Sequence, residues 1–431
     1  MRIQHITAAV AAAALLLSGC SSMSLNSSEI LAPPRAAGDR AGIQKMIEDD
    51  TGGRYELIYP SNSDHKSGVI THDLNADGVD EAVALYKGSD GKAHVMIAEK
   101  QGDSYRSAGV EALSSTSVID LRFADVDGSG REEVIIGCGE DTDSAVLSAF
   151  FTDGEPSMVT VAKGFIDYIT GDFDGDSRDD ILVLIPASAE ASAKADLMIC
   201  GDNGFESKSS CEVDSSIKTY AKLTFSNVND GQKGALLDGV TPDDKYTTQV
   251  LYYDSADKTL INPLFVASGY RDTSRTQKVF STDIDGDGIT EFPLCGLSEH
   301  NKKDDISTVC PLVLWCRYET TQLAPVAKDY TMLCDQAGFQ LRVDEEQTRT
   351  LTARYDADAF TLHEVEYKDN EPQTGRTILT VRRYEPGSFD SSSSSEVVLY
   401  ENSTATYTYT LADNSPFTDE TVKNSFIPME S

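Results

Sequence analysis

Oxygen-bearing side chains recur at a fixed spacing in four short segments of the chain. Each segment starts with Asp and carries Asp, Asn, Ser or Glu at its third, fifth and ninth positions. The four segments are Asp73–Glu81, Asp125–Glu133, Asp172–Asp180 and Asp283–Glu291. Calcium takes about six to eight oxygen ligands, and side chains at positions 1, 3, 5 and 9, with the backbone carbonyl at position 7, can surround one ion. The spacing therefore predicts four calcium-binding loops.

Other metals and other calcium motifs fit these segments less well. No His or Cys stands in them, which disfavours zinc and softer metals. An EF-hand needs an acid at position 12 of its loop and flanking helices. Position 12 is apolar in all four copies, as Ala84, Ile136, Val183 and Leu294. Because these residues lie in short branched runs that favour strands, the sequence indicates a calcium loop between two strands, and helix-flanked dockerin modules are disfavoured too.

The segments belong to an internal repeat. They recur about every 50 residues, a period typical of stacked supersecondary units. A degenerate copy, Asn227–Ala235, lies between the third and fourth segments and lacks the first and last acids, so no calcium is expected there. Position 6 is Gly in three intact copies, which permits positive φ, whereas Ser177 occupies it in the third. The Asp283 segment has four acids and this Gly, so it is predicted to bind calcium most tightly.

In these loops the chain resembles the FG-GAP/VCBS repeats, the calcium-loop blades of integrin-alpha-like β-propellers. The resemblance extends over about residues 55–331 and is weakest in the blade that contains the degenerate copy. It implies a β-propeller whose ions bind between the first two strands of a blade. The implied ligands are Asp73, Asn75, Asp77 and Glu81; Asp125, Asp127, Ser129 and Glu133; Asp172, Asp174, Asp176 and Asp180; and Asp283, Asp285, Asp287 and Glu291.

The segments between the loops have the residue pattern of strands, which predicts about five blades of four strands each. The first two blades are expected at Val69–His72, Ala82–Tyr86, His94–Ala98 and Ser107–Leu113, and at Val118–Ala124, Val134–Gly137, Ala145–Phe151 and Ser157–Lys163. We expect Tyr55–Tyr59 to complete the last blade and close the ring, because closure removes exposed strand edges. A ring of six or seven blades stays open as an alternative. A short helix is expected from about Ile43 to Gly52, where apolar residues have helical spacing.

The amino-terminal residues are typical of a bacterial lipoprotein. The apolar run Ile6–Leu17 is too short to span a membrane but fits a secretory signal. The sequence Leu17-Ser18-Gly19-Cys20 is similar to a lipobox, in which Cys20 takes the lipid. We therefore predict a signal peptide at 1–19 and a lipidated tether at 20–39. The mature protein is then exported and anchored to the bacterial cell membrane, facing outside the cytoplasm.

The chain is strongly acidic, with 71 Asp and Glu against 36 Lys and Arg and a formal net charge of −35. Such a surface repels phosphate backbones, so no nucleic-acid partner is expected. Each calcium loop would hold several like charges within a few ångströms without its ion. Calcium is therefore predicted to stabilise the fold, and a chelator is predicted to lower the melting temperature.

The loop pattern stops near residue 335, where a small, mostly β (α+β) domain of unknown role is predicted at 335–431. Its strands are expected at Phe339–Val343, Thr377–Val381 and Ala405–Thr410, followed by a terminal helix capped by Thr418. Cys295 and Cys310 could face each other across a hairpin and form a disulfide. Trp315 lies in an apolar strand and is expected in the core.

No protease, nucleophile-elbow or phosphate-loop motif occurs, so no catalytic residue is predicted. The repeat region, 40–334, is predicted to be a calcium-stabilised β-propeller that acts as a binding or adhesion module for a surface protein or glycan. Two alternatives stay open, a propeller-fold polysaccharide hydrolase or lyase and a scaffold subunit of an envelope complex. Acids or His free of metal at the propeller mouth would favour the enzyme, whereas an exposed aromatic or apolar patch there would favour binding.

Overall fold

The computed structural model describes residues 39–102, 104–266, 269–270, 272–297, 308–319, 322–392 and 394–429. The predicted signal peptide and the lipidated Cys20 lie outside the described residues. No helix in the described part of the chain combines the length and the apolar character needed to cross a membrane.

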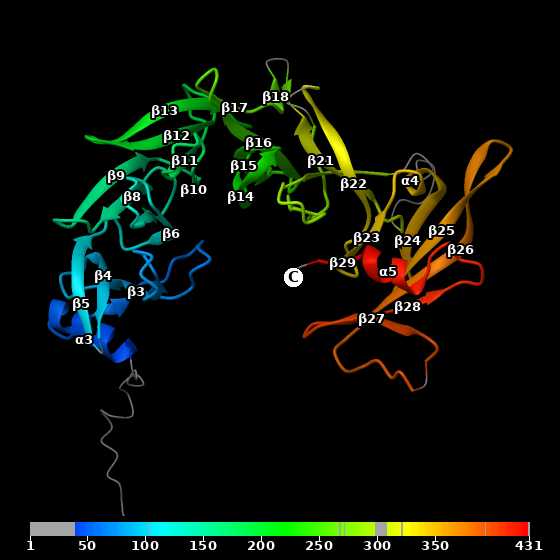
Figure 1. Cartoon of the computed structure of the whole chain (residues 1–431), viewed down its shortest axis with the longest axis horizontal. Coiled ribbons are helices and arrows are strands. Elements are labelled where there is room, and N and C mark those ends of the chain that lie inside the picture. The colour runs from blue at the N-terminus through cyan, green and yellow to red at the C-terminus, as the bar shows by residue number, and fades with distance from the viewer. Residues whose placement is uncertain are drawn as a thin grey trace, which may run out of the picture.

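Antiparallel sheets follow one another along an open arc (Figure 1). The first sheet lies at one end of the arc and the C-terminal sheet at the other. Within the described residues, no strand pairing joins these two ends. The chain is therefore mostly β, as predicted, but the expected closed ring is not found.

A helix and a five-stranded sheet open the fold. Helix α3, Asp39–Thr51, confirms the predicted helix and buries Ile43 and Ile47 against the sheet. The strands are β1 (Glu56–Leu57), β2 (Val69–His72), β3 (Glu81–Lys87), β4 (Ala93–Gln101) and β5 (Ser104–Ala112). They pair in the order β1-β3-β4-β5, and β2 also pairs with β3.

The prediction that Tyr55–Tyr59 completes the last blade is wrong, because β1 pairs with β3 of the first sheet. β2 pairs with only the first four residues of β3, from Glu81 to Ala84. The rest of that strand edge stays open, and β1 pairs there with Tyr86 and Lys87. The free part of the β3 edge therefore pairs with β1, and this pairing keeps β1 in the first sheet.

Three four-stranded antiparallel sheets follow, each with its strands paired in chain order. The second contains β6 (Val118–Ala124), β7 (Glu133–Cys138), β8 (Val146–Phe151) and β9 (Ser157–Lys163). The third contains β10 (Asp167–Gly171), β11 (Asp180–Ile185), β12 (Lys194–Gly201) and β13 (Gly204–Glu212). The fourth contains β14 (Thr219–Asn229), β15 (Gln232–Val240), β16 (Tyr246–Asp254) and β17 (Thr259–Ile261). In Figure 1 the first strands β6, β10 and β14 lie toward the inside of the arc, and β9 and β13 lie toward the outside.

The fifth sheet contains β20 (Phe292–Gly296), β21 (Leu312–Glu319), β22 (Ala324–Cys334), β23 (Phe339–Val343) and β29 (Phe426–Pro428). A small hairpin, β18 (Phe265–Val266) and β19 (Gly269–Tyr270), precedes it. Because β23 pairs with β22 and β29 pairs with β23, the predicted domain boundary between residues 334 and 335 falls inside this sheet. Trp315 of β21 is fully buried, as predicted.

The C-terminal sheet pairs in the order β24-β25-β26-β28-β27. Its elements are α4 (Gln347–Thr350), β24 (Leu351–Asp356), β25 (Ala359–Lys368), β26 (Glu371–Tyr384), β27 (Val397–Glu401), β28 (Thr406–Leu411) and α5 (Asp419–Ser425). The predicted strands Thr377–Val381 and Ala405–Thr410 correspond to β26 and β28, and the terminal helix to α5, whereas the predicted strand Phe339–Val343 is β23 of the fifth sheet. The Thr418 side chain accepts a hydrogen bond from the Thr421 N–H and starts α5, as its predicted cap.

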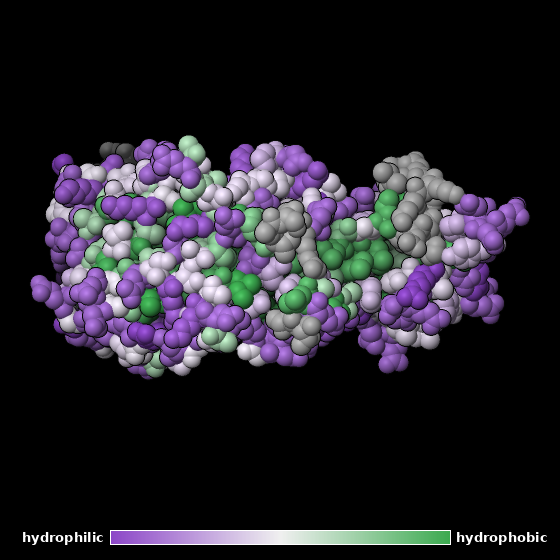
Figure 2. Space-filling model, turned by 90° about the horizontal axis from the view of Figure 1, so that it is seen from above, coloured by the Kyte–Doolittle hydropathy of each residue, from purple (hydrophilic) through white to green (hydrophobic). Residues whose placement is uncertain are grey.

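The hydrophobic core of the repeat region lies between consecutive sheets. In β7, Val134 and Ile136 share a buried cluster with Val83 of the first sheet. Ile135, which lies between them, shares another cluster with Ile181 of the third sheet. Because successive residues of a strand face opposite sides, each middle sheet needs a neighbour on both faces. The outer surface seen in Figure 2 is mostly hydrophilic, in keeping with the net charge of −35.

Candidate metal sites

The four intact loops, named here by their first residues as the Asp73, Asp125, Asp172 and Asp283 loops, have one backbone conformation. Each has positive φ at its fourth and sixth residues. At the sixth residue the angles are 84° for Gly78, 84° for Gly130, 71° for Ser177 and 86° for Gly288. The sequence predicted the turn at position 6, including the strained Ser177, but not the second positive φ at position 4, where Ala76 has φ 55°.

Backbone N–H groups orient the first carboxylate of each loop. In the Asp283 loop, Asp283 accepts hydrogen bonds from the N–H groups of Gly286 (2.7 Å) and Gly288 (2.9 Å). In the Asp125 loop, Asp125 accepts the equivalent bonds from Gly128 (2.8 Å) and Gly130 (2.9 Å). The tight turn therefore fixes the position of this side chain at the centre of the loop.

The ninth residue of each loop is a buried acid, which begins the strand after the loop in three copies and directly precedes β20 in the Asp283 loop. Glu81, Glu133 and Asp180 are 2% exposed and Glu291 is 0% exposed. Each carboxylate accepts a hydrogen bond from the N–H of position 2 in its own loop, at 3.0 Å from Leu74, Val126 and Phe173 and 3.1 Å from Ile284. The strand thus holds one acid beneath the loop, where water cannot fully solvate it.

Burial raises the pKa of these acids. Desolvation, with the charges of Asp127 and Asp125 nearby, raises the pKa of Glu133 to about 8. Desolvation likewise raises the pKa of Asp180 to about 7, and it also raises the pKa of Glu81 and Glu291. A cation beside these carboxylates would favour their charged forms, so the arrangement suits the binding of a positive ion.

Among the described residues, three groups of acids could hold a metal ion, since one ligand oxygen from each member lies within 4.8 Å of the others. The groups are Asp125, Asp127 and Glu133; Asp172, Asp174 and Asp180; and Asp283, Asp285 and Glu291. They are positions 1, 3 and 9 of three predicted loops. The side chains at position 5, which are Asp77, Ser129, Asp176 and Asp287, are not in these groups.

The Asp73 loop does not form such a group within the described residues. Its third position is Asn75, whose side-chain amide donates a hydrogen bond to Glu81 over 3.3 Å. Asp73 still accepts hydrogen bonds from the N–H groups of Asp77 (3.1 Å) and Gly78 (2.9 Å). The loop therefore has the shared turn, with an amide in place of one acid.

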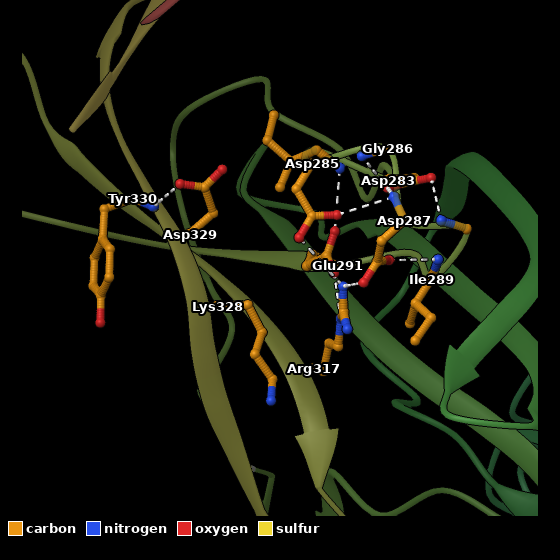
Figure 3. Close-up of polar contacts among 12 residues, drawn as sticks. Asp283, Asp285, Gly286, Asp287, Ile289, Glu291, Arg317, Lys328, Asp329 and Tyr330 are labelled. Atoms are coloured by element: carbon orange, nitrogen blue, oxygen red, sulfur yellow. Dashed lines mark hydrogen bonds and ion pairs between the residues drawn. The ribbon is translucent and has the colours of Figure 1, made fainter. Parts of the chain in front are cut away.

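Basic side chains reach two of the three acidic groups. Arg317 of β21 lies in the Asp283 loop, where its Nη2 is 2.7 Å from Asp287 and 3.5 Å from Asp285 and its Nε contacts Glu291 (Figure 3). Only 9% of the Arg317 side chain is exposed, and its hydrogen bond holds the pKa of Asp287 below the usual range. The protein's own guanidinium therefore partly neutralises this loop.

In the Asp172 loop, Lys208 of β13 contacts Asp174. The contact is with the buried Oδ2 of Asp174, so the Lys208 ammonium already meets the oxygen that a metal ion would need. Lys233 Nζ also lies 3.8 Å from Asp172 Oδ2 in this loop. No described ion pair reaches Asp125, Asp127 or Glu133. The Asp125 loop is therefore the acidic group whose charge the described side chains leave uncompensated.

Consecutive loops are connected to each other. The N–H of Glu132 donates to the carbonyl of Leu74 (2.7 Å), and the N–H of Asp179 donates to that of Asp125 (2.8 Å). The degenerate copy takes part as well, since the N–H of Thr290 donates to the Asn227 carbonyl (2.9 Å). The loops thus form contacts between neighbouring sheets, so an ion in one loop would also stabilise a junction between sheets.

The degenerate copy has lost the loop itself. β14 ends at Asn229 and β15 starts at Gln232, so only Asp230 and Gly231 connect the two strands. Gly231 has φ 69°. An Asp-Gly dipeptide between strands is a strong hairpin signal, and it could have predicted this turn from the sequence.

A cavity of about 490 Å³ is lined in part by residues of β6, β10 and β14, the strands that lie toward the inside of the arc in Figure 1. His65, His72, Asp120, Arg122, Glu132 and Asp167 are among the residues that line it. His72 contacts Glu132 and stacks on Phe123 with ring centroids 4.1 Å apart. Arg122 Nε is 2.7 Å from Asp120, and burial raises the pKa of Asp167 to about 6.

No protein-family model and no curated protein matches the chain. Solved structures match it weakly. A protein from Lactobacillus plantarum is 11% identical, with 72% of this chain and 83% of that chain covered and a TM-score of 0.33. The rhamnogalacturonan lyase PL11 of Bacillus licheniformis is 12% identical, with 80% and 85% covered and a TM-score of 0.32. Sqt1 of Saccharomyces cerevisiae is 10% identical, with 83% and 100% covered and a TM-score of 0.33. Similarities this low establish neither the fold nor the activity of this chain.

The sequence predicted the acids of the loops but not the residues that contact these acids from other strands. Arg317 and Lys208 lie on strands outside the loops that they contact. The pairing of His72 with Glu132 spans 60 positions. Each of these contacts depends on how the strands pair and the sheets stack, and no local motif signals it.

Proposed function

We propose that this protein is an exported, lipid-anchored, calcium-binding module of the β-propeller type, and that its ions are structural. The observation that carries the proposal is the clustering of positions 1, 3 and 9 in three loops that share one backbone conformation. All donors in these groups are carboxylate oxygens, which suit a hard cation such as Ca²⁺. Calcium would supply positive charge to the Asp125 loop, whose acids no described ion pair reaches, and would compete with Lys208 and Arg317 in the other two groups.

The ions would stabilise the fold at the junctions between sheets, because neighbouring loops already exchange hydrogen bonds there. The first five sheets would then serve as blades, in agreement with the resemblance to FG-GAP/VCBS repeats. The lipid on Cys20 would place the module at the outer face of the cell membrane. There it would bind a surface protein or a glycan.

Calcium titration of the full chain tests the metal sites. We expect calcium to raise the melting temperature and EGTA to reverse the rise, with a smaller effect from magnesium, which demands stricter geometry. The double variant Asp125→Asn/Asp127→Asn should reduce the calcium effect. Asp143→Asn, an exposed acid outside the loops, is the matched control and should not. A melting temperature that is the same with calcium and with EGTA would overturn the proposal.

The membrane anchor has a separate test. Cys20→Ser should release the exported protein from the membrane fraction, because no acyl chain can then be attached. If the variant stays in the membrane fraction, the anchor is not the lipid on Cys20, whatever the result of the calcium titration.

The cavity lined in part by β6, β10 and β14 favours a second candidate function, the cleavage of a polysaccharide. Two His and several carboxylates that belong to no calcium loop ligand set line it, and the pKa of about 6 for Asp167 lies near the range useful to a general acid. Incubation of the protein with a polysaccharide panel, followed by detection of new reducing or unsaturated ends, tests this. Turnover that is lost in Asp167→Asn or His72→Ala but kept in EGTA would favour the enzyme over the binding module.

A further inference from the structure

Two cysteines lie opposite each other where the fifth sheet meets the C-terminal sheet. In the β21–β22 ladder Leu312 pairs with Met332, and the N–H of Leu333 donates to the Pro311 carbonyl over 2.9 Å. One further step in the same register places Cys310 opposite Cys334. Both side chains are buried, at 5% and 0% exposure, in one hydrophobic cluster.

The hydrogen bonds show which kind of cross-strand pair this is. The N–H of Cys310 donates to Ala353 on β24 (2.9 Å), away from β22. Pro311 and Leu333 form the hydrogen-bonded pair, so Cys310 and Cys334 form the adjacent non-hydrogen-bonded pair. Such pairs have Cα atoms about 4.5 Å apart and close side chains, within the range of about 4.4–6.8 Å that a disulfide needs. The neighbouring Cys334 thiol, together with burial, raises the pKa of Cys310.

We propose that Cys310 and Cys334 form a disulfide in the exported protein. The expected Cys295–Cys310 disulfide is not supported, because Cys295 pairs with Val313 in the β20–β21 ladder. In the cell the proposal rests on export, since disulfides persist outside the cytoplasm. With purified protein and an added oxidant it is independent of export.

The oxidant belongs to the class of disulfides that react by thiol–disulfide exchange, such as oxidised glutathione. One cysteine thiolate attacks a sulfur of the oxidant, so a mixed disulfide forms and one glutathione thiolate leaves. The second cysteine thiolate then attacks the protein sulfur of the mixed disulfide and releases the other glutathione thiolate. The protein loses two electrons and two protons, and the oxidant gains them as two thiols. Because both cysteines are buried in the folded protein, the exchange occurs before this region closes during folding.

The cross-link would fix the segment that connects the two sheets. Thr308 accepts a hydrogen bond from the N–H of Tyr355 (2.8 Å), and Val309 forms a bridge with Arg354. These contacts join the segment to β24 of the C-terminal sheet, whereas Cys334 ends β22 of the fifth sheet. The disulfide would therefore hold the C-terminal sheet to the repeat region and would close a loop of about 24 residues.

Peptide mapping tests the proposal directly. The full chain is refolded with oxidised and reduced glutathione, alkylated and digested with trypsin. We expect the peptide 304–317, which contains Cys310 and Cys316, to be joined to the peptide 329–342, which contains Cys334. Cys316→Ser is the matched control, because Cys316 is also buried and shares the first peptide, and it should keep the cross-link. Cys334→Ser should abolish it.

Recovery of both peptides only in alkylated form from oxidised, folded wild-type protein would overturn the proposal, as would a cross-link that is lost in Cys316→Ser. Thermal unfolding gives a second measurement. A reductant should lower the melting temperature of the wild type and of Cys316→Ser by several degrees and should leave Cys334→Ser unchanged. Both measurements are made at one fixed calcium concentration, so a negative result would not affect the calcium proposal.

Discussion

The Asp125 and Asp283 loops have the same motif and backbone but different electrostatic surroundings. Both bring an Asp, an Asp and a buried Glu together, and both orient the first Asp through two backbone N–H groups. The Asp283 loop also contains the Arg317 guanidinium, whereas no described ion pair reaches the three acids of the Asp125 loop. The motif therefore specifies the ligands, but a neighbouring strand decides how much of their charge is left for a metal.

This contrast bears on the expectation that the Asp283 loop binds calcium most tightly. The expectation rests on the number of acidic ligands, which is four in the Asp283 loop and three in the Asp125 loop. In the structure the Arg317 guanidinium contacts three of these acids, Asp285, Asp287 and Glu291, and would compete with calcium for them. The Asp125 loop has one acid fewer, but its carboxylates stay available. The two loops can be separated by substitutions that are chemically identical in each.

The largest expected effect follows the loss of the buried acid from the loop that contains Arg317. Glu291→Gln should destabilise the calcium-free protein by about 2–3 kcal/mol, because a buried guanidinium loses one partner. The effect is below the full value for a buried pair, since Asp285 and Asp287 remain. Urea unfolding in EGTA measures it. Glu133→Gln is the matched control, and an equal loss in both variants would show that Arg317 does not distinguish the loops.

The next effect concerns calcium itself. Glu133→Gln should remove the stabilisation that calcium gives through the Asp125 loop, about 2.7 kcal/mol at a calcium concentration 100 times the dissociation constant. In EGTA the same variant should differ little from the wild type, because burial raises the pKa of Glu133 to about 8 and glutamine resembles the protonated acid. Unfolding curves with calcium and with EGTA check both statements. A large loss in EGTA would mean that Glu133 has a cationic partner in the protein.

Removal of the competing guanidinium should have the opposite effect on the other loop. Arg317→Gln should raise the calcium affinity of the Asp283 loop about tenfold, or about 1.4 kcal/mol, because calcium then meets uncompensated carboxylates. Isothermal titration measures the change. Arg106→Gln, which removes an exposed Arg paired with Glu99, is the control and should leave the affinity unaltered. A weaker calcium affinity in Arg317→Gln would show that the guanidinium supports the metal site.

Local patterns predicted the loops and strands well, because those features depend on residues close in sequence. The boundaries of β6 and β9 agree with the predicted strands Val118–Ala124 and Ser157–Lys163, where apolar runs end at turn residues. The ligand groups were predictable for the same reason, since each is contained within nine residues.

Contacts between distant segments could not be predicted in this way. Arg317 meets Glu291 because β20 and β21 pair, and Cys310 meets Cys334 because β21 and β22 continue in register. Strand pairing also explains why the arc is open, since β1 pairs with β3 of the first sheet and not with the last blade as predicted. In each case the physical cause is the choice of partner strand, which hydrophobic alternation alone leaves undetermined.

The smallest expected effect compares the backbones of the loops. Ser177 has φ 71° at the position where Gly130 has φ 84°, and a side chain there is strained. Ser177→Gly should therefore stabilise the protein by about 0.5–1 kcal/mol, with calcium and without it. Gly130→Ser should cost a similar amount, because an added Cβ meets nothing within 4 Å and only the backbone angle opposes it. Paired unfolding curves measure both changes. If Gly130→Ser lost much more stability in calcium than in EGTA, the turn would contribute to ion binding as well as to the shape of the loop.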